Sequence, residues 1–299
     1  MAAVIIPAHQ HQGTDEWKEW RRSRGGASEV AALMGCAPWF PRTPYELWLV
    51  KTGRAVVEVN AAMTRGTALE PAARAYAEEL FGEVFEPQTA ELDRIVASLD
   101  GITFDGQCLL EIKVPAQGRD SELWAHVKEH QAPPEHYLWQ VQQQLLCSGA
   151  RLARFVVCHA DGEQITDAIH CDVLPDVQAH EAIKAAWAQF FEHLDSDTPP
   201  PLTERDVRER EDAEWAAAAQ AWREAKQRLD EAGKAEKAAR ETLIQRAGEQ
   251  SSQGAGVRVT RFWRSGSTDY AKAAKDAGLD LAAYERPGSW QYRITEQSE

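Results

Sequence analysis

The chain has 299 residues and a formal net charge of −14, and no apolar run approaches the roughly 18–20 residues that a transmembrane helix needs. The N-terminal stretch MAAVIIPAHQHQ lacks the basic residues that precede the apolar core of a signal peptide. The five cysteines are scattered and form no C-x-x-C pair, which disfavours a disulfide framework and indicates reduced thiols. We therefore expect a cytoplasmic protein without membrane contact, with room for one large domain and an appendage.

The acidic balance is unfavourable for binding nucleic acid, because phosphate contacts need Lys and Arg. Residues 21–65, however, carry seven basic side chains against three acidic ones, a local charge of +4. Such a tract is compatible with a channel for DNA and equally with an ordinary mixed surface. The motifs therefore carry the functional argument.

In chain order, residues 1–14 are predicted to be a flexible leader and residues 15–24 a helix. A short helix over 28–34 follows Gly25-Gly26, with Ser28 near its N-cap. The free N–H groups at such a helix start favour an anion, although Ser28 also suits a simple capping role.

Two further helices are predicted between residues 43 and 81. Thr43-Pro44-Tyr45-Glu46 is a capping box with proline at the first helical position, and it predicts a helix to Thr52. A longer helix over 64–81 places Glu70 one turn before Arg74, the spacing of a solvated ion pair.

The stretch from 95 to 115 is typical of a β-hairpin around Asp105-Gly106, a pair that favours a type I′ turn. The register set by this turn places Asp100 opposite Glu111. Ser98 then faces Lys113 on the same side of the hairpin. The opposite, apolar face is predicted to hold Ala97, Leu99, Leu110 and Ile112.

Two carboxylates directly opposite each other repel unless a cation lies between them. Mg²⁺ binds one or two carboxylates together with waters and a substrate phosphate, so Asp100 and Glu111 form a candidate metal site. Lys113 beside it can stabilise charge that develops at phosphorus. The pattern indicates phosphodiester hydrolysis, and the alternative is a solvated salt-bridge cluster on a surface hairpin.

After the hairpin, Pro133-Pro134 opens a helix that ends before Gly149 and carries a polar stripe of Tyr137, Gln140 and Gln144. Strands over 154–159 and 164–173 and a helix over 176–194 follow. These elements predict an α/β fold, a mixed sheet with helices on both sides. His159 and His170 have no acidic partner at metal-ligand spacing, and we interpret them as structural.

Five sequence blocks in this order resemble the YqaJ-like viral recombinases and lambda exonucleases of the PD-(D/E)XK (restriction-endonuclease-like) superfamily. The resemblance covers about residues 15–195. The blocks are W-K-E-W-R-R-S-R-G-G-A-S-E (Trp17–Glu29), R-G-T-A-L-E-P (Arg65–Pro71), A-S-L-D-G (Ala97–Gly101), L-E-I-K-V-P-A-Q-G-R-D (Leu110–Asp120) and Y-L-W-Q-V-Q (Tyr137–Gln142).

This resemblance implies hydrolysis of double-stranded DNA from the 5′ end, leaving 3′ single strands for phage-type recombination. It implies two Mg²⁺ or Mn²⁺ ions, and no iron–sulfur cluster because the cysteines are not grouped. The implied partners are duplex DNA ends and a single-strand annealing protein, and ring-shaped trimers are implied for the assembly. A structure-specific endonuclease and a non-catalytic DNA-end-binding protein stay open as alternatives.

The resemblance also implies roles for individual residues. Asp100, Glu111, the Ile112 carbonyl and in some measure Glu70 would hold the metals, and Lys113, Gln140 and Tyr137 would act in catalysis. The DNA and its 5′-phosphate would be bound by Arg21, Ser28, Ser98 and Arg119.

We predict an exonuclease domain over 15–198, a proline linker over 199–202, a heptad-bearing segment over 203–250 and a small α/β cap over 251–299. Trp215, Trp222 and Leu229 recur at sevenfold spacing, and Gly233 is predicted to break this segment into a helical hairpin. The cap is predicted to be a strand over 256–263, a helix over 269–277 and a strand over 289–295. Partner docking, oligomerisation and DNA guiding are the open roles for this part.

Overall fold

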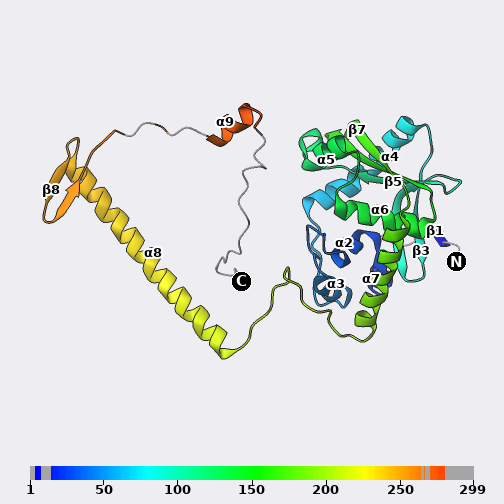
Figure 1. The fold of residues 1–299 in the computed structure, drawn as a ribbon, viewed down its shortest axis with the longest axis horizontal. Helices are drawn as coiled ribbons and strands as arrows, with labels where there is room; N and C mark the ends of the chain where they lie inside the picture. The colour runs from blue at the N-terminus through cyan, green and yellow to red at the C-terminus, as the bar shows by residue number, and fades with distance from the viewer. Residues whose placement is uncertain (1–3, 8–14, 264–265, 267–269, 280–299) are drawn as a thin grey trace. The chain divides into compact units, whose positions relative to one another are not determined.

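The computed structural model describes residues 4–7, 15–263, 266 and 270–279, and its contacts divide the chain into two units, 1–209 and 210–299. The first unit holds a large sheet with its helices, and the second is dominated by one long helix (Figure 1). No helix in the described ranges is long and apolar enough to cross a membrane.

The sheet of the first unit is mixed, with strands in the order β1-β3-β4-β5-β6-β7 and β2 paired to β4. β5 runs parallel to β6 and β2 parallel to β4, and the other pairs are antiparallel. The strands are β1 (Val4–Pro7), β2 (Gly25–Gly26), β3 (Glu86–Leu92), β4 (Ile95–Ile102), β5 (Cys108–Lys113), β6 (Leu152–Asp161) and β7 (Gln164–Val173).

The helices of this unit include the six that the sequence predicted, with ends shifted by a few residues, and α5, which it did not. Helix ends follow local chemistry: Thr43 accepts from the Glu46 amide at 3.1 Å, and Gly82 and Gly149 end their helices at positive φ. The helices are α1 (Asp15–Arg22), α2 (Val30–Leu33), α3 (Pro44–Lys51), α4 (Ala61–Phe81), α5 (Glu122–His130), α6 (Glu135–Ser148) and α7 (Val177–Asp195), with 3₁₀ turns η2 (Ala27–Glu29) and η3 (Gly118–Asp120).

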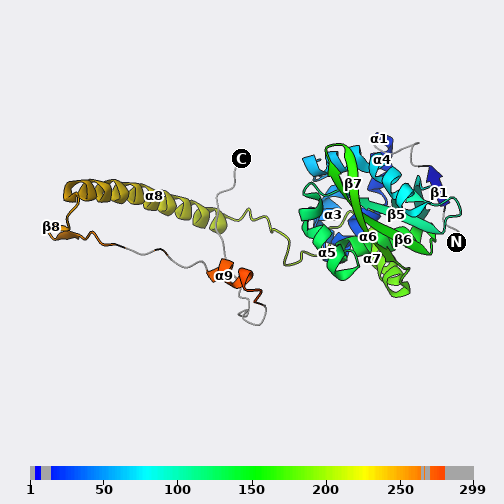
Figure 2. The same cartoon turned by 90° about the horizontal axis from the view of Figure 1, so that it is seen from above.

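The two faces of the sheet are each covered. On one face, Leu109 and Phe155 are buried with apolar side chains of α2, α6 and α7, including Trp187. On the other, Leu110 and Val156 are buried with α4. The expected α/β class, a mixed sheet with helices on both sides, is confirmed (Figure 2).

The predicted hairpin forms, but its turn is of another type. The Gly106 amide donates to the Thr103 carbonyl at 2.8 Å, and only Gly106 has positive φ, whereas a type I′ turn also requires it at Asp105. The register is nevertheless as predicted, with Gly101 paired to Leu110 and Ile102 to Leu109.

A β-bulge in β4 changes which residues share a face. β3 pairs Gln88 with Leu99 and Glu86 with Ile102, so β4 has one extra residue at Asp100-Gly101. As a result Ala97 and Leu99 are buried under α6, whereas Leu110 and Ile112 lie in the core under α4. The prediction that these four share one apolar face was wrong, because the bulge resets the alternation.

The N-terminal leader was also predicted incorrectly in one part. Val4–Pro7 pair antiparallel with β3 as an edge strand, because the exposed edge of β3 offers free backbone groups to an apolar segment.

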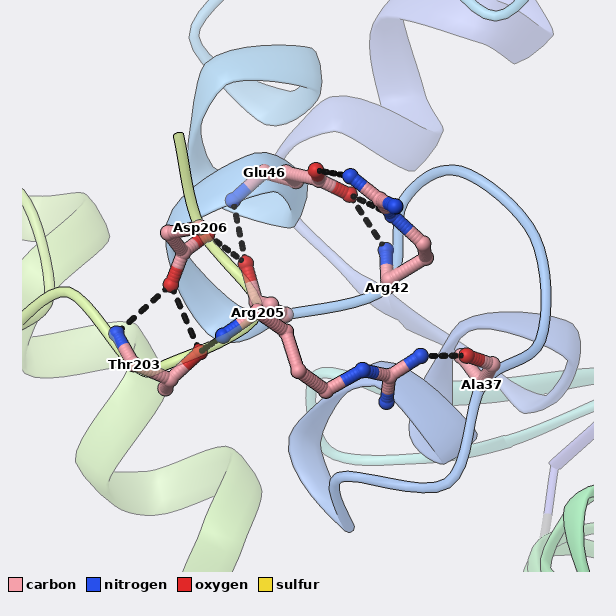
Figure 3. Close-up of polar contacts among 7 residues, drawn as sticks. Ala37, Arg42, Glu46, Thr203, Arg205 and Asp206 are labelled. Atoms are coloured by element: carbon pink, nitrogen blue, oxygen red, sulfur yellow. Dashed lines mark hydrogen bonds and ion pairs between the residues drawn. The ribbon is translucent and has the colours of Figure 1, made fainter. Parts of the chain in front are cut away.

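The first unit continues past the proline run at 199–201. Arg205 donates to the carbonyls of Gly35, at 2.7 Å, and Ala37. Asp206 accepts from the Thr203 amide at 2.7 Å and from the hydroxyl of Thr43 (Figure 3). This anchor segment, 203–206, therefore fixes the loop at 35–43 that leads into α3.

The loop held by the anchor segment carries Trp39, whose side chain is about half exposed. Its ring centroid lies 5.1 Å from that of His136 and 6.2 Å from that of Tyr137, at the start of α6. The anchor thus supports an aromatic group beside Tyr137, which the sequence predicted to act in catalysis.

The second unit contains α8 (Ala213–Ala247), the hairpin strands β8 (Ser252–Gly254) and β9 (Val257–Val259), and α9 (Tyr270–Asp276). α8 is continuous through Gly233, so the predicted helical hairpin was wrong; the surrounding Ala, Glu, Lys and Arg residues favour helix strongly enough to tolerate one glycine. The predicted strand over 289–295 lies outside the described residues.

Candidate active site

Asp100 lies at the bulge, where β4 and β5 separate after the pair Gly101–Leu110. Its Oδ2 accepts the Ile112 amide at 2.7 Å. Burial and the nearby Glu111 carboxylate hold the pKa of Asp100 well above its ordinary value. The positive charge of Lys113 is therefore too small to stabilise the ionised form of Asp100 against burial and the Glu111 carboxylate.

Glu111 is 2 % exposed and is held by side chains from α6. Gln140 donates to its Oε1 at 2.7 Å, and Gln144 donates to its Oε2. Gln144 also donates to the Ser98 carbonyl at 3.1 Å, which ties β4 to this carboxylate. Buried carboxylates need such donors, because an unsatisfied buried charge is costly.

Lys113 forms an ion pair with Glu111, and its Nζ lies 4.7 Å from the centroid of the Tyr137 ring. Burial works against the charged ammonium, but Glu111, Tyr137 and Asp100 together outweigh it and raise the pKa of Lys113. Tyr137 in turn packs on Phe155 of β6, with ring centroids 5.6 Å apart. Lys113 is therefore a fixed cation at the carboxylate pair.

Glu70 approaches the same place from α4. It pairs with Arg74 at 2.6 Å, and the Arg74 Nε donates to the Asp100 carbonyl at 2.6 Å. The Glu70 charge also raises the pKa of Asp100. The Glu70–Arg74 ion pair is therefore not freely solvated, because Arg74 also donates a hydrogen bond to the backbone at the bulge.

The chemistry of these donors fits a hard divalent cation. Oδ1 of Asp100 has no hydrogen-bond partner among the described residues. The Ile112 carbonyl projects to the same side as its amide, toward Asp100, because both groups of a strand residue point the same way. Within the described ranges no group of three or more His, Cys, Asp and Glu side chains is arranged to hold a metal.

The predicted phosphate-binding residues are spread over two places. Arg21 pairs with Glu29 at 3.4 Å, and Ser28 is exposed in the turn η2. The N-cap position of that turn is Gly26, whose amide donates to Glu29 at 2.8 Å. Behind them, Lys51 pairs with Glu29 at 2.7 Å.

Arg119 lies in η3, where its Nε donates to Asp167 of β7 at 2.7 Å. Arg119 and Arg21 therefore pair with different carboxylates, Asp167 and Glu29. Ser98 is half-buried next to the bulge.

Two glutamines of α6 have contacts that the sequence did not reveal. Gln144 holds Glu111, and Gln143, fully buried, donates to the carbonyls of Gly25 at 2.8 Å and Val96 at 2.9 Å. Gln143 also accepts the Trp187 indole N–H at 2.8 Å. The sequence held two signals: Gln144 lies on the predicted polar stripe, and Gln143 stands in a run of three glutamines at 142–144, where a helix side that faces a core rarely carries amides.

Comparison with known proteins relates part of this chain to a family. Residues 16–151 match the family model of the YqaJ-like viral recombinase domain. The resemblance predicted from the five sequence blocks is thereby confirmed, and all of the central carboxylates and Lys113 lie within the match.

Two relatives extend the comparison. The uncharacterized protein YqaJ of Bacillus subtilis (strain 168) is 29 % identical over 150 residues, which cover 48 % of this chain and 45 % of that protein. The chain thus spans less than half the length of this curated relative.

The alkaline exonuclease LHK-Exo from Laribacter hongkongensis has a similar structure, with 28 % identity and a TM-score of 0.50. The match covers 62 % of this chain and 94 % of that one, and a structure of LHK-Exo in complex with dAMP gives the same values. The YqaJ-like segment therefore lies on a fold that an exonuclease also uses.

Proposed function

We propose that this chain is a metal-dependent deoxyribonuclease that degrades linear double-stranded DNA from its ends. The observation that carries the proposal is the convergence of Asp100, Glu111 and Lys113 at the point where β4 and β5 separate. The likeness to an alkaline exonuclease at 28 % identity supports it.

In this proposal Asp100, Glu111 and the Ile112 carbonyl hold Mg²⁺ or Mn²⁺, two ions by resemblance, and Glu70 assists from α4. The bound metal would supply an activated water and charge stabilisation at phosphorus. Lys113 places a fixed positive charge beside the scissile phosphate. Gln140 and Tyr137 orient the groups around Glu111 and Lys113.

The finer part of the proposal concerns direction. We infer that digestion runs 5′ to 3′ and leaves a 3′ single strand for an annealing protein in phage-type recombination. Arg21, Ser28, Ser98 and Arg119 are the proposed contacts to the DNA and its terminal 5′-phosphate. The support is their position in the sequence blocks shared with the family, together with the basic side chain of each arginine. A ring-shaped trimer is the assembly that the same resemblance suggests.

Incubation of the purified protein with linear and covalently closed circular duplexes in Mg²⁺ tests the function. We expect loss of the linear form with the circle intact. Cutting of the circle would instead identify a structure-specific endonuclease on the same fold. Absence of cleavage of both forms, with binding retained, would identify a non-catalytic DNA-end-binding protein.

A further inference from the structure

The hairpin after α8 ends in an exposed aromatic pair. Phe262 is 75 % exposed and Trp263 is 93 % exposed, and only Thr260 and Arg261 separate them from the end of β9. Large aromatic side chains are costly to leave in water, and adjacent exposed ones mark a binding surface more often than a scattered single residue does.

The backbone that leads into this aromatic pair is held by the hairpin turn and by hydrogen bonds of Arg261. The hairpin closes through Ala255 and Gly256, both at positive φ, which is the type I′ turn that was predicted elsewhere in the chain. Arg261 ties its far end, because its amide donates to the Ser251 hydroxyl at 3.0 Å and its Nη1 to the Glu249 carbonyl at 2.8 Å. The residues next to the aromatic pair are therefore held in place.

The two arginines beside the aromatic pair, Arg258 and Arg261, form hydrogen bonds to neutral oxygens. Arg258 donates to the amide oxygen of Gln253 at 2.8 Å, and Arg261 donates to a backbone carbonyl. Neither forms an ion pair with a carboxylate among the described residues, although eleven other arginines do. The sequence contains no acidic residue from 250 to 268, in a chain with 47 acids and a net charge of −14.

We propose that Arg258, Arg261, Phe262 and Trp263 form a binding site for single-stranded DNA. The arginines would contact phosphates and the aromatic rings would stack on unpaired bases, the combination by which proteins bind single strands without reading sequence. A duplex does not offer its base faces to such rings, so the site discriminates in favour of single strands. That the enzyme itself produces this strand rests on the proposed function, whereas the binding does not.

The experiment uses the full chain in EDTA, so that binding is measured without cleavage. Fluorescence anisotropy of a labelled 30-nucleotide oligo(dT) is compared with that of a blunt duplex of the same length. We expect Phe262→Ala and Trp263→Ala each to weaken oligo(dT) binding on the order of tenfold, since a stacked base contributes about that much. Duplex binding should be unchanged.

Matched controls come from the same unit. Trp215→Ala removes another exposed tryptophan, 54 % exposed on α8, and should leave oligo(dT) binding unaltered. The double variant Arg258→Gln/Arg261→Gln should lower the slope of log affinity against log salt by about 1.4, since each phosphate contact to a single strand contributes about 0.7. Arg223→Gln on α8 should not change that slope.

Crosslinking gives a direct readout. Oligo(dT) that carries 5-iododeoxyuridine should crosslink to the peptide containing Phe262 and Trp263 under ultraviolet light. Unchanged oligo(dT) affinity in both aromatic variants, or equal losses for oligo(dT) and duplex, would overturn the proposal. Because these readouts need no turnover, an inactive nuclease with an intact single-strand site is distinguishable from an active one without it.

Discussion

The Asp100 carboxylate accepts the backbone amide of Ile112 at 2.7 Å, across the gap where β4 leaves β5. This hydrogen bond replaces the backbone pairing of β4 with β5, which stops at Gly101 and Leu110. It keeps one oxygen of Asp100 toward the strand and the other available to a ligand. The bulge that creates the gap is therefore the feature that turns a hairpin into a candidate metal site.

We predict that Asp100→Asn, Glu111→Gln and Lys113→Ala each lower turnover on linear duplex by at least about 100-fold, because each removes a charge that the reaction needs. Steady-state kcat with Mg²⁺ is the measurement, and circular dichroism verifies folding. Asp105→Asn in the loop of the same hairpin is the control and should retain activity. More than a few per cent of wild-type kcat in Asp100→Asn would remove the metal-site assignment.

Substitutions of the two buried glutamines Gln143 and Gln144 of α6 should have different effects, the first on the free energy of unfolding and the second on kcat. Gln143→Leu leaves the Gly25 and Val96 carbonyls without their donor, and we expect it to destabilise the fold by roughly 1–3 kcal/mol while kcat of the folded protein persists. Gln144→Leu releases Glu111 and should lower kcat roughly tenfold. Urea denaturation and kcat are measured for both, and equal kcat losses would contradict the division.

The Glu29–Lys51 pair should give the first unit a stability that depends on pH. Burial opposes ionisation of Glu29, but Lys51 and Arg21 outweigh it, and its pKa is lowered. A carboxyl with a lowered folded pKa stabilises the protein above its unfolded pKa, about 4.3, and this contribution disappears as pH falls through the folded value.

Wild-type unfolding free energy should therefore fall more steeply below about pH 5 than that of Glu29→Gln. Lys51→Met should cost roughly 3 kcal/mol at neutral pH, because it leaves a largely buried carboxylate, 17 % exposed, with one partner fewer. Parallel pH dependences in wild type and Glu29→Gln would show that the pair carries no such linkage.

The effect of C-terminal truncation on stability should depend on where the chain ends. A chain that ends at Glu209 keeps the anchor segment and should unfold and cleave as the full chain does. A chain that ends at Pro201 loses Arg205 and Asp206, and we expect its free energy of unfolding to drop by about 1–3 kcal/mol. Thermal unfolding of both forms, with Asp206→Ala in the full chain as a point control, is the measurement. Equal melting temperatures would mean that the anchor adds nothing.

End recognition makes a separate prediction. Wild-type protein should degrade 5′-phosphorylated duplex faster than 5′-hydroxyl duplex. Arg21→Ala or Arg119→Ala should reduce that preference about tenfold, since a charge-assisted contact contributes roughly 1.5–3 kcal/mol. Asp167→Ala, which frees Arg119 from its ion pair, is the control and should not reduce it. Equal wild-type rates on both ends would exclude a terminal-phosphate pocket.

The sequence alone determined the class of fold, the hairpin register and the shared family blocks. Helix ends, turn residues and apolar periodicity act over a few neighbouring residues, so Thr43 and Gly149 mark helix ends without knowledge of the rest of the fold. The D, E and K of the candidate site were likewise visible, because the register follows from the loop.

Only the tertiary structure decided how these groups are presented. The bulge at Asp100, the attachment of Gln144 to Glu111 and the return of Asp206 to Thr43 join residues that are far apart in sequence, with the last pair 163 positions apart. The edge strand at Val4–Pro7 was decided in the same way, by a free sheet edge. Local pattern cannot specify such contacts, because their free energy depends on what the rest of the chain brings alongside.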